Sequence, residues 1–483
     1  MCFRSAGPCT AAARITLALL ELTMHIQKRS GLTASRFLFM LDAAFLALAC
    51  YAAVLLIATD HPIGPAALAF PATDLMFLYA LGLYRREALI ETGDMLGRVP
   101  IAAGASSLIS WAATAALPGG FALPNAHLVF AACVPCFAAA GLAARLTLQL
   151  LRRRGAFRRR LLVIGAGRRA WDLIWVLRRE ARTLAFDVIF VHADVMGEVD
   201  PRLTKDPGSR IVVGLKDLLA TVRGLNPDQI VVAPDERRGL ATDSLLACKM
   251  AGYPVTEYAQ FLEKEIGRID LKRLDLGWLL YSDGFVMGTM DRCLKRALDL
   301  TIGAVLLFLV SPTLLVAALA VKLEDPGPAL HRQDRVSRGG RVFRILKLRT
   351  MASNAEGCGA VRVAKADPRM TRIGLILRRT RLDELPQLLN ILRGDMAFVG
   401  PRPERPDFTQ KLSSQLPLYE ERHLVRAGLT GWAQVNYPHG ASLNDARSKL
   451  SYDLFYVKNF GILFDLRIIL QTLHVMFWPS GAR

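Results

Sequence analysis

The feature that most constrains this chain is a series of long apolar blocks, because a helix of about 20 apolar residues can cross the hydrocarbon core of a membrane. Hydrophobic residues make up 52% of the 483 residues and are concentrated in these blocks. The second block is the weakest, since Pro71 and Asp74 lie inside it. We expect four transmembrane helices within 37–152. Their blocks are about 37–59, 65–84, 99–118 and 126–151.

Charged residues give the orientation of these blocks. Lys and Arg number 61 against 42 Asp and Glu, a net charge of +19. Basic residues lie before the first block, between the second and third, and in RRRGAFRRR after the fourth, whereas the connections TDHPIG and GGFALPN contain none. Basic loops stay on the cytoplasmic side, so both ends of the bundle, including the N-terminal segment 1–36, are expected to be cytoplasmic. Beside membrane spans, this excess favours lipid headgroups or phosphorylated substrates over nucleic acid.

Strand-like and helix-like segments alternate over 160–262, which predicts a doubly wound parallel sheet. The first strand leads into Gly165-Ala-Gly167-Arg-Arg-Ala170, the loose form of a dinucleotide-binding turn. The acidic residue expected about 20 positions later is missing. The sequence therefore favours a Rossmann-like domain kept for packing or regulation, without a redox cofactor. A connector is expected over 263–292.

A fifth apolar run, about 301–322, has Ser311 and Pro312 at its midpoint. Proline removes one intrahelical hydrogen bond, so a helix broken here could enter one leaflet and leave on the same face. The freed carbonyl groups need partners, and the Ser311 hydroxyl can supply one. The chain that follows is strongly basic, which disfavours its translocation. We therefore predict a re-entrant helix; the alternative is a proline-kinked true span.

Charged residues after this run form two motifs that suit phosphate chemistry. In strand geometry Lys347 and Arg349 would share a face, and two cations there suit a diphosphate. Asp383 and Glu384 follow three arginines, and adjacent carboxylates can divide attack on phosphorus from the binding of Mg²⁺ or a proton. We interpret Asp383 as a helix N-cap, where the helix dipole keeps a carboxylate ionised and attracts phosphate. The alternatives are a solvated basic strand and a capped helix with an exposed acidic pair.

Two further motifs are turns. Pro401 and Pro403 fix the backbone around Arg402, which pre-places one guanidinium for phosphate or nucleobase recognition. The last motif, GLTGWAQVN, is rich in glycine and side-chain donors and is followed by YDLFYVKN.

Taken in order and at their spacing, these motifs resemble the monotopic phosphoglycosyl transferases, the bacterial sugar transferases that begin exopolysaccharide, capsule or O-antigen repeat units. The resemblance covers about 290–478, and a four-span bundle with a Rossmann-like domain ahead of it is similar to the long form of the family. QVNYPHGAS resembles the branch associated with exosortase-type exopolysaccharide loci. Ala427 departs from the proline common in the family. The resemblance also includes Lys295-Arg296, Ser311-Pro312 and Gly394-Asp395-Met396.

The resemblance implies transfer of a sugar-1-phosphate from a UDP-sugar to undecaprenyl phosphate, at the cytoplasmic face of the bacterial inner membrane. Asp383 would be the nucleophile that forms a phosphosugar-aspartyl enzyme and releases UMP, and Glu384 would help it hold Mg²⁺. Arg378 and Arg402 would bind phosphate or nucleotide. The remaining residues expected at the substrate site are Lys347, Arg349, Pro401 and Pro403. The sugar and the oligomeric state stay open, a homo-oligomer included.

Two rival functions were weighed. A nucleotide-sugar oxidoreductase or dehydratase acting at the Gly165 turn would need an acid–base set, yet 160–260 contains no Tyr-x-x-x-Lys. A non-enzymatic membrane scaffold would predict a broken Asp-Glu pair or Pro-Arg-Pro turn, and both are intact. The predicted fold class is an α/β membrane protein: a four-helix transmembrane bundle, a Rossmann-like doubly wound domain, and a small α/β catalytic domain over 293–483 with a re-entrant helix.

Overall fold

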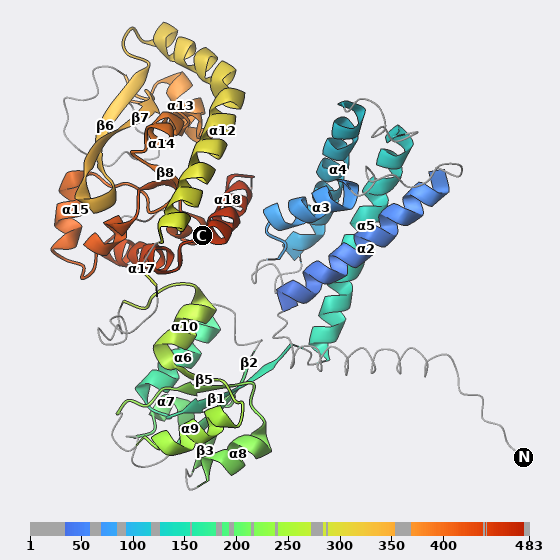
Figure 1. Ribbon diagram of the computed structural model, residues 1–483, viewed down its shortest axis with the longest axis vertical. Helices are drawn as coiled ribbons and strands as arrows, with labels where there is room; N and C mark the ends of the chain where they lie inside the picture. Colours follow the sequence, from blue (N-terminus) through green and yellow to red (C-terminus); the bar gives the residue numbers. More distant parts are fainter. Residues whose placement is uncertain are drawn as a thin grey trace, which may run out of the picture. The chain divides into compact units, whose positions relative to one another are not determined.

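The structure is a computed structural model (Figure 1). Its residues form two compact units, divided after Ile266. Most of the predicted segment 1–36 and the middle of the connector 263–292 lie outside the residues that the structure describes. The described residues are 34–57, 69–84, 93–116, 126–154, 157–179, 186–192, 198–213, 217–236, 240–271, 284–285, 288–352, 369–437, 440 and 442–477.

Over the described residues before 154, the first unit contains four helices, each overlapping one predicted apolar block. By length and composition two of them could cross a membrane, over Ala34–Ala53 and His127–Arg153. The second helix has 12 residues, too few for a span, and contains the Pro71 and Asp74 that marked its block as weak. The structure thus supports two of the four predicted spans, and the other two stay predictions. The helices are α2 (Ala34–Ile57), α3 (Ala69–Ala80), α4 (Gly93–Ala116) and α5 (Ala126–Arg153).

Buried charged residues connect these helices. Arg145 of α5 donates to the Asp42 carboxylate of α2 over 2.7 Å, and the Tyr84 hydroxyl donates to the same carboxylate over 2.8 Å. Ser106 of α4 donates to Asp74 of α3 over 2.7 Å. All five side chains are buried. A charge in apolar surroundings is tolerated when it is partnered, so these contacts fix which helices lie together.

A five-stranded parallel sheet follows, in the order β3-β2-β1-β4-β5, which confirms the predicted doubly wound sheet. Side chains of β1 alternate between two hydrophobic clusters: Leu161 and Val163 pack with α6 and α10, and Leu162 and Ile164 pack with α8 and α9. Helices therefore cover both faces. The elements are β1 (Arg159–Ile164), α6 (Arg168–Arg179), β2 (Phe186–His192), α7 (Pro201–Thr204), β3 (Arg210–Val213), α8 (Leu218–Leu225), β4 (Gln229–Val232), α9 (Thr242–Met250), β5 (Val255–Glu257) and α10 (Tyr258–Ile266).

The second unit packs helices around an antiparallel pair, β6 with β7, and a short parallel pair, β8 with β9. Its main hydrophobic cluster joins β7, α14, β8, α16, α17 and α18. The elements are α12 (Thr289–Glu324), β6 (Leu330–Val336), η4 (Arg338–Gly340), β7 (Val342–Leu348), α13 (Arg372–Arg379), η6 (Leu382–Glu384), α14 (Gln387–Arg393), β8 (Ala397–Val399), α15 (Pro406–Ser413), η7 (Glu420–Leu424), β9 (Gly428–Thr430), α16 (Trp432–Asn436), α17 (Leu443–Asn459) and α18 (Ile462–Phe477).

The apolar run predicted to be re-entrant lies in α12, which also meets the length and composition of a membrane span. The chain stays helical through Ser311 and Pro312, so the expected break is not an interruption of the helix. Figure 1 shows that α12 changes direction along its length. The Ser311 hydroxyl donates to the Phe308 carbonyl over 2.8 Å. Pro312, four residues after Phe308, has no N–H for that carbonyl, so the Ser311 hydroxyl supplies its partner, and the re-entrant path stays a prediction.

Candidate active site

Asp383 and Glu384 lie on η6, a single 3₁₀ turn between α13 and α14. Helix α14 begins at Gln387, with Pro386 in the N-cap position, so the prediction of Asp383 as an N-cap was wrong. An N-cap carboxylate accepts from a backbone N–H two or three residues later, and three residues after Asp383 stands Pro386, which has no N–H. The carboxylate is thus not used to cap the helix.

Glu384 is surrounded by cations from three segments. The Arg402 guanidinium lies 2.8 Å from Glu384 Oε1, and Lys347 Nζ lies 3.3 Å from the same oxygen. Arg381, which has a left-handed φ of 58°, lies 3.8 Å from Oε2. Burial would raise the pKa of Glu384, but Arg402 and Lys347 outweigh it and hold the pKa well below its usual range. Glu384 is therefore ionised at neutral pH.

Asp383 differs from its neighbour in its electrostatic surroundings. Burial, and then the negative charge of Glu384, raise the pKa of Asp383, while Lys347 and Arg378 act in the opposite direction more weakly. The pKa values of the two adjacent carboxylates are thus pushed apart, which is how paired acids take different roles in catalysis. Asp383 is therefore the more basic of the pair.

The structure brings four predicted site residues together, while the guanidinium groups of Arg349 and Arg378 contact other residues. Lys347 and Arg402 lie with the acid pair, whereas Arg349 donates to the Asp325 carbonyl after α12 and lies 3.6 Å from the carboxylate of Asp325. Strand β7 ends at Leu348, so strand alternation does not place Arg349 beside Lys347. Arg378 is exposed and contacts the Met370 sulfur over 3.4 Å. Phosphate binding by Arg349 and Arg378 stays a prediction.

Residues that the sequence interpretation missed hold the strand before Arg402. Asp299 of α12 accepts from the backbone N–H of Phe398 over 2.8 Å. Lys295 Nζ donates to the Val399 carbonyl over 3.0 Å and forms an ion pair with Asp465 at 2.5 Å. An acidic residue inside a helical, otherwise apolar face was the signal that it is buried and partnered.

The Pro-Arg-Pro turn is also held by backbone and side-chain donors. Gly428 N–H donates to the Pro401 carbonyl over 2.9 Å, and Arg335 donates to the Pro403 carbonyl over 3.0 Å. Pro401 and Pro403 therefore restrict the turn through contacts as well as through their rings. Arg335 was another residue that the sequence interpretation missed, since its partner lies 68 residues away.

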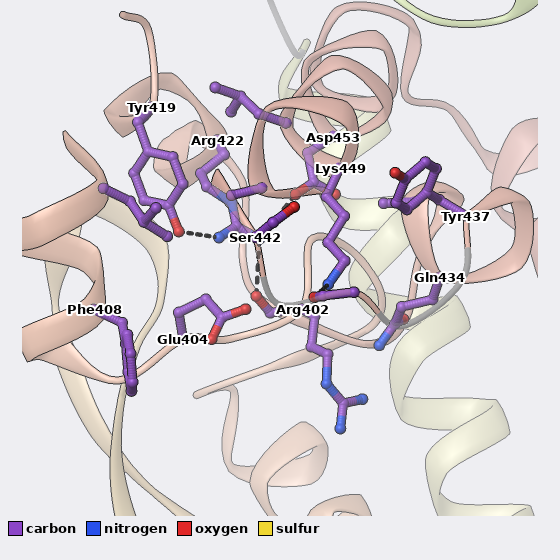
Figure 2. A pocket seen from close by; sticks show the side chains of 15 residues that line it. Arg402, Glu404, Phe408, Tyr419, Arg422, Gln434, Tyr437, Ser442, Lys449 and Asp453 are labelled. Atoms are coloured by element: carbon purple, nitrogen blue, oxygen red, sulfur yellow. Dashed lines mark hydrogen bonds and ion pairs between the residues drawn. The ribbon is translucent and has the colours of Figure 1, made fainter. Parts of the chain in front are cut away.

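A pocket opens beside Arg402 (Figure 2). Its cavity volume is about 70 Å³ and it is partly open to solvent, which is small beside the roughly 300–1,000 Å³ typical of small-molecule sites. Its lining comes from α15, η7, α16 and α17 and mixes aromatic with polar side chains. They include Phe408, Tyr419, Tyr437, Glu404, Gln434, Ser442 and Lys449.

The glycine turn of the Rossmann-like sheet is filled by a side chain of this unit. Both carboxylate oxygens of Asp235, which follows β4, accept from the first backbone N–H groups of α6: Arg168 N over 2.6 Å and Arg169 N over 2.9 Å. A Cβ at Gly167 would clash with this carboxylate, so the glycine makes room for Asp235. The position at which a dinucleotide-binding turn receives phosphate already holds an anion.

Comparison with known proteins matches the second unit to characterised relatives. A family model described as bacterial sugar transferase matches residues 290–479. A UDP-glucose:undecaprenyl-phosphate glucose-1-phosphate transferase of Caulobacter vibrioides is 46% identical over 190 residues, 39% of this chain and 71% of that protein. The chain belongs to the bacterial sugar transferase family. An exopolysaccharide production protein PSS of Rhizobium leguminosarum bv. phaseoli is 41% identical to this sugar transferase over 190 residues, 38% of this chain and 95% of that protein.

A longer stretch of this chain, 242 residues, matches another relative. A UDP-N-acetylgalactosamine-undecaprenyl-phosphate N-acetylgalactosaminephosphotransferase of Aeromonas hydrophila is 39% identical over 242 residues. That match covers 50% of this chain and 56% of the relative. The sugar transferase therefore spans little more than half the length of that protein.

Proposed function

We propose that this sugar transferase moves a sugar-1-phosphate from a UDP-sugar to undecaprenyl phosphate and so starts exopolysaccharide repeat-unit assembly. The observation that carries the proposal is the η6 turn, where Asp383 with a raised pKa lies beside a Glu384 held by Lys347 and Arg402. Such a site offers a nucleophile and cations for a diphosphate. The names of the relatives, which state UDP-sugars and undecaprenyl phosphate for those proteins, support the same substrate classes.

In the proposed reaction a carboxylate oxygen of Asp383 attacks the phosphorus that carries the sugar. A bond between Asp383 and this phosphorus forms, the bond to the bridging oxygen of the diphosphate breaks, and UMP leaves with that oxygen. An oxygen of undecaprenyl phosphate then attacks the same phosphorus and releases the Asp383 carboxylate. Lys347 and Arg402 bind diphosphate oxygens and offset their charge. The pocket beside Arg402 is partly open to solvent and is lined by aromatic and polar side chains of the kind that bind a nucleoside or a sugar.

Mg²⁺ is the proposed cofactor, and Asp383 and Glu384 are the residues that would hold it. Among the described residues no cluster of three or more His, Cys, Asp or Glu side chains is arranged for a metal. Mg²⁺ commonly uses one or two carboxylates with substrate phosphates, so the carboxylates of Asp383 and Glu384 are suitable ligands by type and number. Both oxygens of Glu384 contact cations, so phosphate oxygens would have to draw Lys347 or Arg402 away first. When bound, the ion would neutralise phosphate charge.

We infer that α12 enters the membrane from the cytoplasmic face and returns to it, which places the site at the inner membrane where UDP-sugars are present. The bend in α12 and the bonded Phe308 carbonyl support this path. So does a band of exposed apolar side chains on α12, which a membrane would cover. They are Phe308, Leu309, Leu315, Val316 and Leu319. The four-span bundle and the exosortase-associated branch remain part of the proposal.

The Rossmann-like domain is proposed to act without a redox cofactor. Asp235 supplies a negative charge where the pyrophosphate of a dinucleotide would lie, and two anions at one helix N-terminus repel each other. This observation supports the transferase over a nucleotide-sugar oxidoreductase.

The proposal is tested with the full-length protein in lipid nanodiscs, a panel of UDP-sugars, Mg²⁺ and undecaprenyl phosphate. We expect UMP and a polyprenyl diphosphosugar from at least one UDP-sugar, measured by a coupled UMP assay and mass spectrometry. UMP release should also occur without acceptor, in proportion to enzyme. No UMP from any UDP-sugar at a range of Mg²⁺ concentrations would reject the function.

A further inference from the structure

A buried arginine lies behind the Pro-Arg-Pro turn, on the side of the pocket. Arg422 of η7 is 5% exposed, and its guanidinium lies between Tyr419 and Asp453 (Figure 2). It donates to the Tyr419 hydroxyl over 2.8 Å and pairs with the Asp453 carboxylate at 2.8 Å. Asp453 is the aspartate of the YDLFYVKN motif and is itself 3% exposed. The motif thus supplies a buried counter-charge, a use that the reaction above does not account for.

The same guanidinium contacts the turn directly. Arg422 Nη2 donates to the backbone carbonyl of Arg402 over 2.9 Å, while the side chain of Arg402 reaches Glu384 at 2.8 Å. Asp453, Arg422, Arg402 and Glu384 therefore form one continuous chain of contacts across the catalytic unit. A group needed at a reacting centre gains from support that limits its orientations.

The carbonyl groups of the other two residues of the turn have their own donors, so Arg422 restrains the turn through the Arg402 carbonyl. Pro401 O accepts from Gly428 N, and Pro403 O accepts from Arg335. Among the contacts of the described residues, the carbonyl of Arg402, which lies between these two prolines, accepts a hydrogen bond from Arg422 alone. Without it, the peptide that follows Arg402 could rotate and take the guanidinium with it.

We propose that Arg422, with Asp453 as its counter-charge, is a positioning residue that fixes the backbone of Arg402 and so aims the Arg402 guanidinium at the acid pair. The inference rests on the proposed function for its activity readout. Arg422 touches no reacting atom in this scheme and acts through Arg402 alone.

The experiment must separate aiming from loss of folding, because removing Arg422 alone leaves a buried aspartate unpaired. The main variant is therefore Arg422→Gln with Asp453→Asn, which removes both charges together. The matched control is Arg344→Gln with Asp334→Asn, the same chemical change at an exposed pair 3.9 Å apart in the same unit. Arg402→Ala and the triple variant Arg402→Ala, Arg422→Gln, Asp453→Asn complete a double-mutant cycle.

We expect the main variant to lose about 10- to 100-fold in UMP release, the range seen when a catalytic group is misplaced by about 1 Å. The Arg344 control should keep wild-type rates. The triple variant should be no slower than Arg402→Ala alone, since there is no guanidinium left to aim. Wild-type rates in the main variant, or losses that multiply in the triple variant, would overturn the proposal.

Hydrogen exchange gives a readout that does not need catalysis. The backbone amides of Gly400, Arg402, Glu404 and Arg405 should exchange faster in the main variant than in the Arg344 control, at unchanged thermal stability of the rest of the unit. Unchanged exchange there would reject the positioning role even with activity lost. If the wild type releases no UMP, the proposed function fails, and the exchange result still decides the role of Arg422.

Discussion

Arg402 lies 2.8 Å from Glu384, and this contact joins two motifs that are 18 residues apart in the chain. Glu384 raises the pKa of the Arg402 guanidinium, and Arg402 helps to keep Glu384 ionised. Asp383, one residue away, is left with a raised pKa. Glu384 is thus held as an anion and Asp383 is the more basic of the pair, and the following predictions depend on this difference.

Asp383→Asn should reduce UMP release by about 10³-fold or more, at least ~4 kcal/mol of transition-state stabilisation, because an amide oxygen cannot replace an ionised carboxylate. Asp383 caps no helix, so thermal stability should stay close to wild type. The phosphosugar adduct on Asp383, measured by mass spectrometry, should be absent. Asp407→Asn, the same change at an exposed aspartate, serves as the control. Retention of most turnover by Asp383→Asn would exclude the covalent route.

Glu384→Gln should be severely impaired, because Arg402 and Lys347 lose their shared anion and a carboxylate for Mg²⁺ is removed. If metal binding is part of the defect, added Mg²⁺ should restore some UMP release. A Mg²⁺ titration of wild type and variant measures this as a shift of the half-saturating concentration. An unchanged half-saturating concentration would place the role of Glu384 entirely in holding the cations.

The rate of UMP release should fall as pH falls through the pKa of Asp383, which must be ionised to attack. Burial and Glu384 raise that pKa, so the decline should begin at a higher pH than for an ordinary aspartate. Lys347 lowers the pKa of Asp383, so Lys347→Gln should move the acidic limb to still higher pH. Single-turnover rates measured across pH give the midpoint pH of the acidic limb independently of the maximal rate. A limb that moves to lower pH would contradict this assignment.

The path of α12 can be tested by labelling. Asp299 is unsuitable for labelling because it is buried and accepts from the backbone N–H of Phe398. The native Cys293 is exposed, as is Lys322 at the other end of the apolar run. With other cysteines replaced, Cys293 and Lys322→Cys should both react with an impermeant maleimide in inside-out vesicles and neither in intact cells. Labelling of position 322 from outside would mean that α12 spans the membrane.

Wild-type protein should bind no NAD, because Asp235 already fills the α6 N-terminus. Asp235→Ala should lower the free energy of unfolding of the first unit by about 0.5 to 2 kcal/mol, the cost of removing a side-chain acceptor from the first N–H groups of a helix. Differential scanning fluorimetry with and without NAD measures both quantities. A rise in the melting temperature of the wild type on addition of NAD would show that the turn receives a dinucleotide after all.

Local sequence patterns predicted the doubly wound sheet and the charged motifs, because strand periodicity, glycine turns and paired acids are visible within a few residues. The patterns wrongly predicted Asp383 as a helix N-cap. It lies on a 3₁₀ turn, and Pro386 occupies the N-cap position of the following helix. The patterns also grouped Arg349 with Lys347, although the strand ends between them.

The buried charges were not predicted, because their partners are distant in the chain. Asp299 and the amide it binds are 99 residues apart, and Lys295 and Asp465 are 170 residues apart. Periodicity marks such residues as polar and therefore exposed. Only the three-dimensional structure shows that each one is matched to a specific backbone group or counter-charge.

The contacts of Lys295 and Asp299 with β8 have a consequence for how this protein can be made and handled. Helix α12 supports the catalytic unit, because Lys295 and Asp299 hydrogen-bond to the backbone of β8, the strand that leads to the Pro-Arg-Pro turn. A fragment cut after the helix to obtain a water-soluble enzyme would leave Val399 and Phe398 without their partners. The site should therefore form only after α12 has packed against β8. Detergents that separate the two should abolish activity at concentrations that do not yet unfold the protein.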